Sequence, residues 1–128
     1  MKLLLDTHAF IWWATEPEKL SPKAQGLIAD PSNSLLLSVV AVWEMQIKSQ
    51  LGKLQLNLPL RELVEAQQRV NGLWVLAIEL EHVLALDSLP AHHKDPFDRL
   101  LIAQAVVEDA ALVSKDNAFV SYAVKLVW

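Results

Sequence analysis

Five acidic side chains fall where a fold of alternating strands and helices would bring them together. Asp6 follows the first apolar run, Glu44 lies early in the helical segment after the second, and Asp116 follows a later run. Asp95 and Asp98 open the long helical segment that precedes that later run. Ligands of parallel sheets bind beyond the carboxyl ends of the strands, and clustered carboxylates raise one another's pKa unless a cation neutralises them. The pattern therefore predicts a cation site.

The donor atoms indicate the kind of cation. The chain contains no cysteine and no pair of histidines at metal-ligand spacing, so the candidate ligands are oxygen atoms. Oxygen ligands suit a hard ion such as Mg²⁺ or Mn²⁺. One or two such ions can activate water and stabilise the leaving oxygen of a phosphodiester. The five acids are therefore candidate ligands of such an ion.

Each acid also has a purely structural explanation. Asp6 and Asp116 could cap the helices that follow them, and Asp95, three residues before Asp98, is typical of a helix N-cap. For Asp95 we favour the cap. Glu44 could be a solvated acid near a helix N-terminus, although its neighbours are apolar. Capping explains single residues, but it does not require all five at one edge.

The elements that must position these acids follow from the hydrophobic pattern. Strands are predicted at residues 2–5, 35–37, 73–76, 112–113 and 125–128, and helices at 8–14, 22–28, 39–51, 60–70, 79–86 and 96–109, with a short one after 115–117. This alternation indicates right-handed crossovers and a parallel sheet covered on both faces. The predicted fold class is a three-layer α/β/α sandwich with a central parallel sheet, in one domain over residues 1–128.

Composition excludes several classes of protein. Hydrophobic residues make up 53% of the chain and glycine occurs 3 times, which excludes disorder and collagen. The lack of cysteine excludes a disulfide scaffold and fits a reducing compartment. No segment approaches the ~20 apolar residues that span a bilayer, and Asp6 ends the first apolar run too early for a signal peptide. We expect a cytoplasmic protein with no membrane partner.

The acids also belong to a longer pattern. It consists of LLDTH at residues 4–8, Glu44 in the helix after Ser38, HKDPFDRLLIAQA at 93–105, Ser114-Lys115-Asp116, and the terminal VKLVW. Together these segments resemble a PIN domain of the VapC toxin type over the whole chain. The resemblance implies a metal-dependent endoribonuclease that cleaves single-stranded RNA and belongs to a toxin–antitoxin pair. It matches Asp6, Glu44 and Asp98 to the three principal acids of the family and Asp116 to a more variable fourth. On this match we predict that these four acids are the metal ligands and the catalytic residues.

The resemblance also implies a cofactor and partners. These are Mg²⁺ or Mn²⁺, a second copy of the chain in a homodimer, and a small antitoxin that docks and blocks the site. Asp95 belongs to the Asp-Pro-Phe-Asp-Arg subgroup of the family and is a secondary site candidate. Nothing in the pattern identifies a particular RNA.

The net charge argues against an RNA partner. Fifteen acids against 11 bases give −4 at pH 7, and an acidic domain repels nucleic acid. Two divalent ions would add +4 and bring the total to zero, whereas a single ion would leave −2. We therefore expect RNA binding to depend on the metal more than on a basic surface.

Several polar residues near the acids are secondary candidates. Thr7 could orient water or phosphate, or begin a helix. Arg99 could contact phosphate, although an ion pair with Asp95 or Asp98 is the simpler expectation. His92 and His93 could touch RNA, but loop histidines are more often solvated.

Aromatic and basic residues could complete an RNA surface. Trp12 or Trp13 could stack a base, with at least one of them packed in the core, and Trp43 and Trp74 are predicted to be core residues. The candidates for contacts to the RNA backbone are Lys48, Lys53, Arg61 and Arg69. They could equally form an ordinary solvated face.

Three other classes of protein remain as alternatives. A phosphatase of the haloacid-dehalogenase type also places an aspartate after its first strand, but it normally needs a second one two residues later, where this chain has His8. A receiver-like phosphoacceptor needs an aspartate after its third strand, and residues 74–77 supply none. A non-catalytic interaction module could keep the fold, but it would not need five acids at one edge.

Overall fold

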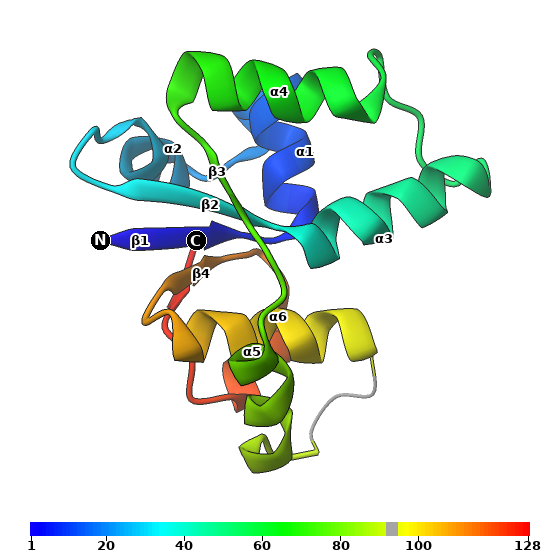
Figure 1. Cartoon of the computed structure of the whole chain (residues 1–128). Coiled ribbons are helices and arrows are strands. Elements are labelled where there is room, and N and C mark those ends of the chain that lie inside the picture. Colours follow the sequence, from blue (N-terminus) through cyan, green and yellow to red (C-terminus); the bar gives the residue numbers. More distant parts are fainter. Residues whose placement is uncertain (92–94) are drawn as a thin grey trace.

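The computed structural model describes residues 1–91 and 95–128 and contains one five-stranded sheet. The strands are β1 (Lys2–Leu5), β2 (Ser34–Ser38), β3 (Trp74–Leu76), β4 (Ala111–Val113) and β5 (Leu126–Val127). They are all parallel and lie in the order β3-β2-β1-β4-β5 (Figure 1). Successive strands are added on one side of β1 and then on the other. The carboxyl ends of β1 and β4 therefore flank the switch point at which such sheets bind ligands.

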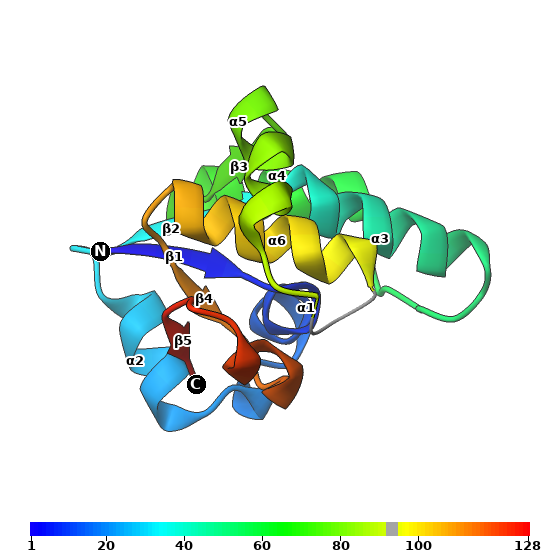
Figure 2. The same ribbon diagram turned by 90° about the horizontal axis from the view of Figure 1, so that it is seen from below.

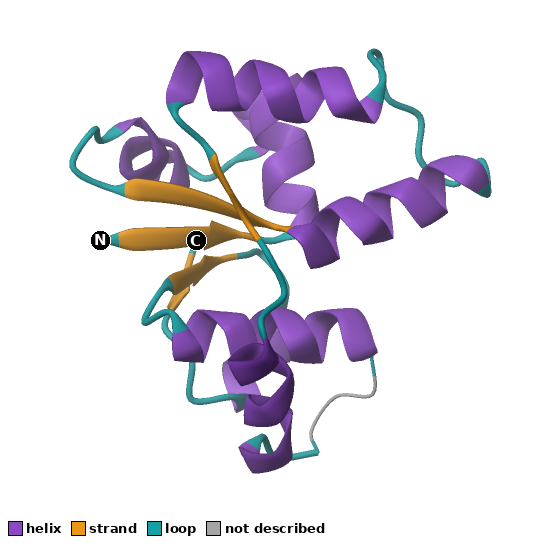
Figure 3. Ribbon diagram, viewed as in Figure 1, coloured by secondary structure: helices purple, strands orange, loops and turns teal. Residues whose placement is uncertain are grey.

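Helices cover both faces of this sheet. They are α1 (Thr7–Thr15), α2 (Pro22–Ala29), α3 (Val39–Gln50), α4 (Leu60–Asn71), α5 (Leu80–Leu84) and α6 (Pro96–Val107), with 3-10 turns η1 (Pro17–Lys19), η2 (Ala85–Ser88) and η3 (Asn117–Ser121). Helices α1, α2 and α4 lie on one face, and α5 and α6 lie on the other (Figures 1 and 2). Helix α3 continues from β2 beyond the carboxyl edge of the sheet (Figure 3). The predicted three-layer α/β/α fold is confirmed.

The leucine run of β1 supplies both halves of the core. Leu3 and Leu5 pack with residues of α1 and α2, while Leu4 packs on the opposite face with residues of α6. All three leucines are fully buried. A strand covered on both faces must be apolar at every position, which is why this run has no alternating pattern. The buried run also determines where the chain leaves the sheet, which is at Asp6.

The predicted helix boundaries follow from capping residues. Ser21 Oγ accepts a hydrogen bond from Ala24 N at 3.0 Å, and Ser38 Oγ accepts one from Val40 N at 3.0 Å. Helix α4 ends at Gly72, whose φ of 66° is the left-handed conformation that glycine adopts most readily. One prediction was too coarse, since the expected helix at 79–86 is divided into α5 and η2. No helix in the described residues is long and apolar enough to cross a bilayer.

The prediction that Trp43 and Trp74 are core residues is wrong. Trp43 is 54% exposed and Trp74 is 68% exposed. Trp74 lies on β3, which forms the edge of the sheet. Trp43 lies on α3, where its ring contacts Phe97 edge to face with the centroids 4.8 Å apart. An apolar sequence run does not reveal which strand becomes the edge strand or which helix extends beyond the sheet.

Candidate active site

The five predicted acids meet in one cleft at the carboxyl edge of the sheet. The cleft has a volume of about 180 Å³ and is lined by Asp6, Thr7, His8, Glu44, Lys48, Asp95, Asp98, Asp116 and Phe119. The acids come from the ends of β1 and β4, from the second turn of α3 and from the start of α6. Segments that are distant in the sequence therefore converge at the carboxyl edge of the sheet, as we predict from the residues that follow each strand.

Of the five acids in the cleft, Asp6 is the one whose side chain is buried. Its side chain caps α1 by accepting a hydrogen bond from Ala9 N at 2.8 Å, and its other oxygen accepts one from Ser114 Oγ at 2.5 Å. Burial raises the pKa of Asp6, against the hydrogen bonds from Ser114 and Ala9 and the neighbouring His8, which lower it, and the nearby Asp116 adds a smaller increase. Asp6 is thus both a cap and a desolvated carboxylate that a bound cation would stabilise.

Ser114 joins the two acids at the switch point, a role that the sequence did not reveal. Its hydroxyl donates to Asp6 and accepts from Asp116 N at 3.0 Å, and its side chain is buried. Asp116 itself caps η3 by accepting from Ala118 N at 2.9 Å. The available signal was a hydroxyl directly after β4, two residues before an aspartate, which is typical of a local side-chain turn.

Glu44 is held from two sides. Thr7 Oγ1 donates to Glu44 Oε1 at 2.5 Å, and Lys48 Nζ lies 3.1 Å from Glu44 Oε2. The side chain of Glu44 is 16% exposed, so it is not a solvated surface acid. Thr7, which was a candidate for orienting water or phosphate, here orients Glu44.

Asp95 and Asp98, at the start of α6, both line the cleft. Asp95 lines the cleft and caps the helix, because its Oδ1 accepts from Phe97 N at 2.9 Å and from Asp98 N at 3.4 Å. Arg99 does not line the cleft: its guanidinium donates to the carbonyls of Pro90 at 3.0 Å and Leu86 at 3.5 Å, instead of pairing with either aspartate. The candidates His92 and His93 lie outside the described residues.

The donors in the cleft fit a hard divalent cation by their chemistry. All five acids offer carboxylate oxygens, and Asp6 is desolvated. Within residues 1–91 and 95–128, however, no group of three or more His, Asp or Glu side chains is already arranged as a metal site. Glu44 is paired with Lys48, so a cation entering the cleft would compete with that ammonium group.

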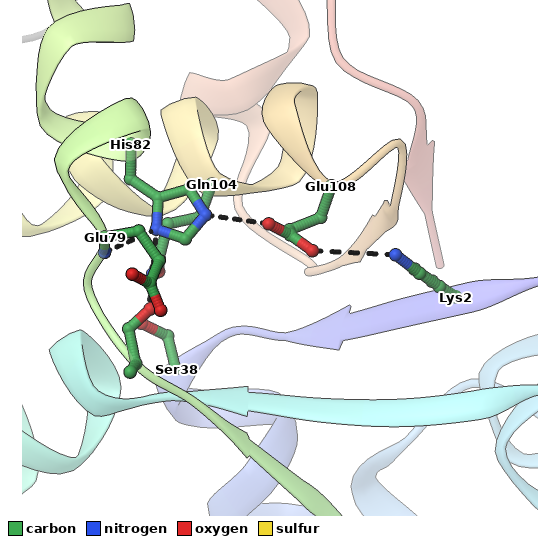
Figure 4. Close-up of polar contacts among 7 residues, drawn as sticks. Lys2, Ser38, Glu79, His82, Gln104 and Glu108 are labelled. Atoms are coloured by element: carbon green, nitrogen blue, oxygen red, sulfur yellow. Dashed lines mark hydrogen bonds and ion pairs between the residues drawn. The ribbon is translucent and has the colours of Figure 1, made fainter.

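A buried polar contact ties α6 to the start of α3 (Figure 4). Ser38 Oγ donates to Gln104 Oε1, and Gln104 Nε2 donates to the carbonyl of Ala77 at 3.2 Å. The side chains of Ser38 and Gln104 are fully buried. Gln104 shares α6 with Asp98, and Ser38 caps the helix that carries Glu44. This contact therefore fixes the helices of two cleft acids relative to each other.

The same network continues through a fully buried histidine (Figure 4). His82 Nδ1 accepts from Glu79 N at 2.9 Å and lies 3.3 Å from Gln104 Nε2. A backbone amide can only donate, so the geometry assigns the ring proton to Nε2, which donates to Glu108 Oε2 at 2.9 Å. The hydrogen bond from His82, followed by the charge of Lys2, lowers the pKa of Glu108. The sequence singled out neither His82 nor Glu108.

The fold and the cleft define a class: a parallel α/β/α sandwich with carboxylates gathered at the switch point of its sheet. The chain belongs to the PIN domain family, whose model matches residues 3–125. Among curated proteins, it is 29% identical over 121 residues to Ribonuclease VapC22 of Mycobacterium tuberculosis (strain ATCC 25618 / H37Rv). That alignment covers 94% of this chain and 91% of the relative.

Solved structures show the same fold. The complex of VapBC2 from Rickettsia felis with a promoter DNA fragment matches with a TM-score of 0.73 at 14% identity, covering 99% of this chain and 98% of that one. DNA-bound VapBC from Salmonella typhimurium gives 0.71 at 15%, covering 99% and 97%. FitAcB from Neisseria gonorrhoeae gives 0.63 at 16%, covering 98% and 96%.

Proposed function

We propose that this chain is a single PIN domain that hydrolyses RNA phosphodiester bonds with the help of bound Mg²⁺ or Mn²⁺. The observation that carries the proposal is the convergence of five carboxylates, one of them desolvated, in one cleft at the switch point. The similarity to a protein named as a ribonuclease supports it. Asp6, Glu44, Asp98 and Asp116 would hold the metal, and Asp95 would serve α6 as a cap.

The chain's own residues position those ligands. When bound, the divalent ion would supply Lewis-acid activation of water and neutralise the scissile phosphate. Ser114 and Ala9 N hold the Asp6 carboxylate in one orientation, and Thr7 holds that of Glu44. Without a cation, the carboxylates would repel the RNA backbone. RNA binding at the cleft should therefore require the metal.

Cleavage of RNA by the purified chain tests this proposal. Total cellular RNA is incubated with the protein in Mg²⁺, in EDTA, and in EDTA followed by excess Mg²⁺, and new RNA ends are mapped by sequencing. We expect defined new ends with Mg²⁺, none with EDTA and their return when Mg²⁺ is restored. RNA that stays intact under all three conditions, or cleavage that EDTA does not affect, would contradict the proposal.

We further propose that the chain is the toxin of a toxin–antitoxin pair and forms a homodimer. Its structural neighbours include VapBC toxin–antitoxin systems, which supports the first part. The homodimer is what the family resemblance implies.

Co-expression tests the toxin assignment. Producing the chain alone should arrest growth, and producing it with the product of a small neighbouring reading frame should restore growth. An Asp6→Asn chain, which lacks one proposed metal ligand, serves as the control and should not arrest growth. An arrest of equal strength with and without the neighbouring product would count against a cognate antitoxin.

A further inference from the structure

Two grooves adjoin the acidic cleft, one on each side of an aromatic pair formed by His8 and Trp12 on α1. The first has a volume of about 380 Å³ and shares Thr7, His8 and Lys48 with the cleft. The second has a volume of about 470 Å³ and shares Asp6, His8 and Asp116 with the cleft. Trp12 lines both grooves but not the cleft. The three hollows are therefore contiguous around one aromatic pair.

The structure distinguishes the roles of the two tandem tryptophans. The Trp12 ring lies 5.6 Å from the ring of exposed His8 and 5.8 Å from that of Trp128, between centroids. Trp128 thus braces Trp12 while part of Trp12 still faces the grooves. Trp13 instead contacts Phe10 at 6.3 Å and lines a separate hollow that contains none of the cleft residues. Of the two tandem tryptophans, Trp12 is therefore the one placed to meet a ligand that crosses the cleft.

Positive charges lie in both grooves. Lys19, Lys48 and Lys53 line the first, and Lys115 lines the second. Lys48 and Lys19 are ion-paired, to Glu44 at 3.1 Å and to Glu16 at 2.5 Å. Within the described part of the chain, Lys53 and Lys115 have no ion pair.

The other two predicted backbone-contact candidates lie elsewhere. Arg61 is paired with Glu65 at 3.4 Å and lines a groove between α3 and α4, while Arg69 lines neither groove beside the cleft. Of the four candidates, the structure therefore places only the two lysines next to the cleft.

We propose that the two grooves form one path for single-stranded RNA across the cleft. A base stacks on the Trp12–His8 pair, and the phosphates on either side are bound by Lys53 in the first groove and Lys115 in the second. Aromatic platforms flanked by cations are how proteins bind unpaired strands without reading a fixed sequence. A base paired in a duplex cannot lie on Trp12, so the path selects single strands. This inference rests on the ribonuclease function proposed above.

Steady-state cleavage of a short RNA that spans a mapped cleavage site tests the path. Trp12→Leu should raise KM about tenfold, the effect of losing one base–aromatic stack, and leave kcat within about threefold. Trp74→Leu, at a tryptophan that is 68% exposed on β3, is the matched control and should leave KM unchanged. Removing the single base that stacks on Trp12 should raise KM about tenfold for the wild type and have no further effect on Trp12→Leu.

Lysine variants keep the test decisive if Trp12→Leu fails to fold. Lys53→Ala should make the salt dependence of 1/KM shallower by about 0.7 in log–log slope, the value for one phosphate of a single strand. Lys23→Ala, at an exposed lysine of α2 outside both grooves, should leave the slope unchanged.

The possible negative results distinguish the proposed RNA path from the proposed ribonuclease function. Unchanged KM and salt slope in a wild type that cleaves RNA would overturn the path and leave the ribonuclease intact. Variants that escape the antitoxin while keeping a normal KM would overturn it too, because the grooves would then bind protein rather than RNA. A wild type that cleaves no RNA would remove both the function and the path.

Discussion

Asp6→Asn will abolish RNA cleavage and, in the absence of metal, will make the protein more stable than the wild type at neutral pH. Cleavage should fall by about 100-fold or more, as expected when a charge that serves the reacting centre is removed. The fold should persist, because the amide oxygen of asparagine can still accept from Ala9 N and its NH₂ group can donate to Ser114 Oγ. Cleavage assays and thermal unfolding in EDTA measure the two effects.

The stability gain follows from the sign of the pKa shift. Burial raises the pKa of Asp6 above its ordinary value of 3.8, so the folded protein binds this proton more tightly than the unfolded chain does. The resulting destabilisation is absent below pH 3.8, grows as the pH rises through the folded-state pKa, and is complete above it. The difference in Tm between the wild type and Asp6→Asn should therefore be present at pH 7 and vanish at low pH.

A matched control separates this effect from a general effect of charge removal. Asp87→Asn removes the same charge from an exposed position on η2 and should alter neither cleavage nor the pH profile of Tm. The account of Asp6 would be wrong if metal-free Asp6→Asn melted below the wild type at pH 7. It would also be wrong if the variant cleaved RNA at the wild-type rate.

Gln104→Leu will destabilise the protein by about 2–4 kcal/mol. The substitution leaves the buried Ser38 hydroxyl and the Ala77 carbonyl without the partners that Gln104 supplies, and each unsatisfied group costs about 1–3 kcal/mol. For a domain of this size the loss corresponds to a fall in Tm of about 10 °C. Urea unfolding of the wild type and the variant measures the change in free energy, and an unchanged m-value would show that the unfolded state is comparable.

The control for Gln104 is a glutamine without buried partners. Gln50→Leu, at the exposed end of α3, should change the free energy of unfolding by less than about 0.5 kcal/mol. Because Gln104 also fixes the helix of Asp98 against that of Glu44, its loss should lower kcat more than it raises KM for RNA. A Gln104→Leu protein as stable as Gln50→Leu would show that the network does not hold the two helices together.

The sequence predicted the parts of this site that depend on local chemistry. Serine and glycine caps predicted where α2, α3 and α4 begin or end. The apolar runs before Asp6 and Asp116 identified β1 and β4, and parallel strands bring such residues to one edge by geometry.

Contacts between residues that are far apart in the sequence could not be predicted from the sequence. Ser38 and Gln104 are 66 residues apart, and nothing local to either one indicates the other. The exposure of Trp74 is a second case, because it depends on β3 being an edge strand, and the sequence of β3 does not show which strands pair. Arg99 is a third case: the nearby acids in the sequence favour an ion pair, but its guanidinium donates instead to two carbonyls that precede α6.

Thermal unfolding with and without Mn²⁺ tests most directly whether the cleft acids form a metal site. At ten times the dissociation constant, an ion that binds only the folded state stabilises it by about 1.4 kcal/mol, or about 3–5 °C in Tm for a domain of this size. We predict a rise of this size for the wild type and none for Asp6→Asn at the same Mn²⁺ concentration. Equal rises in the two proteins, or no rise in the wild type at millimolar Mn²⁺, would contradict the account.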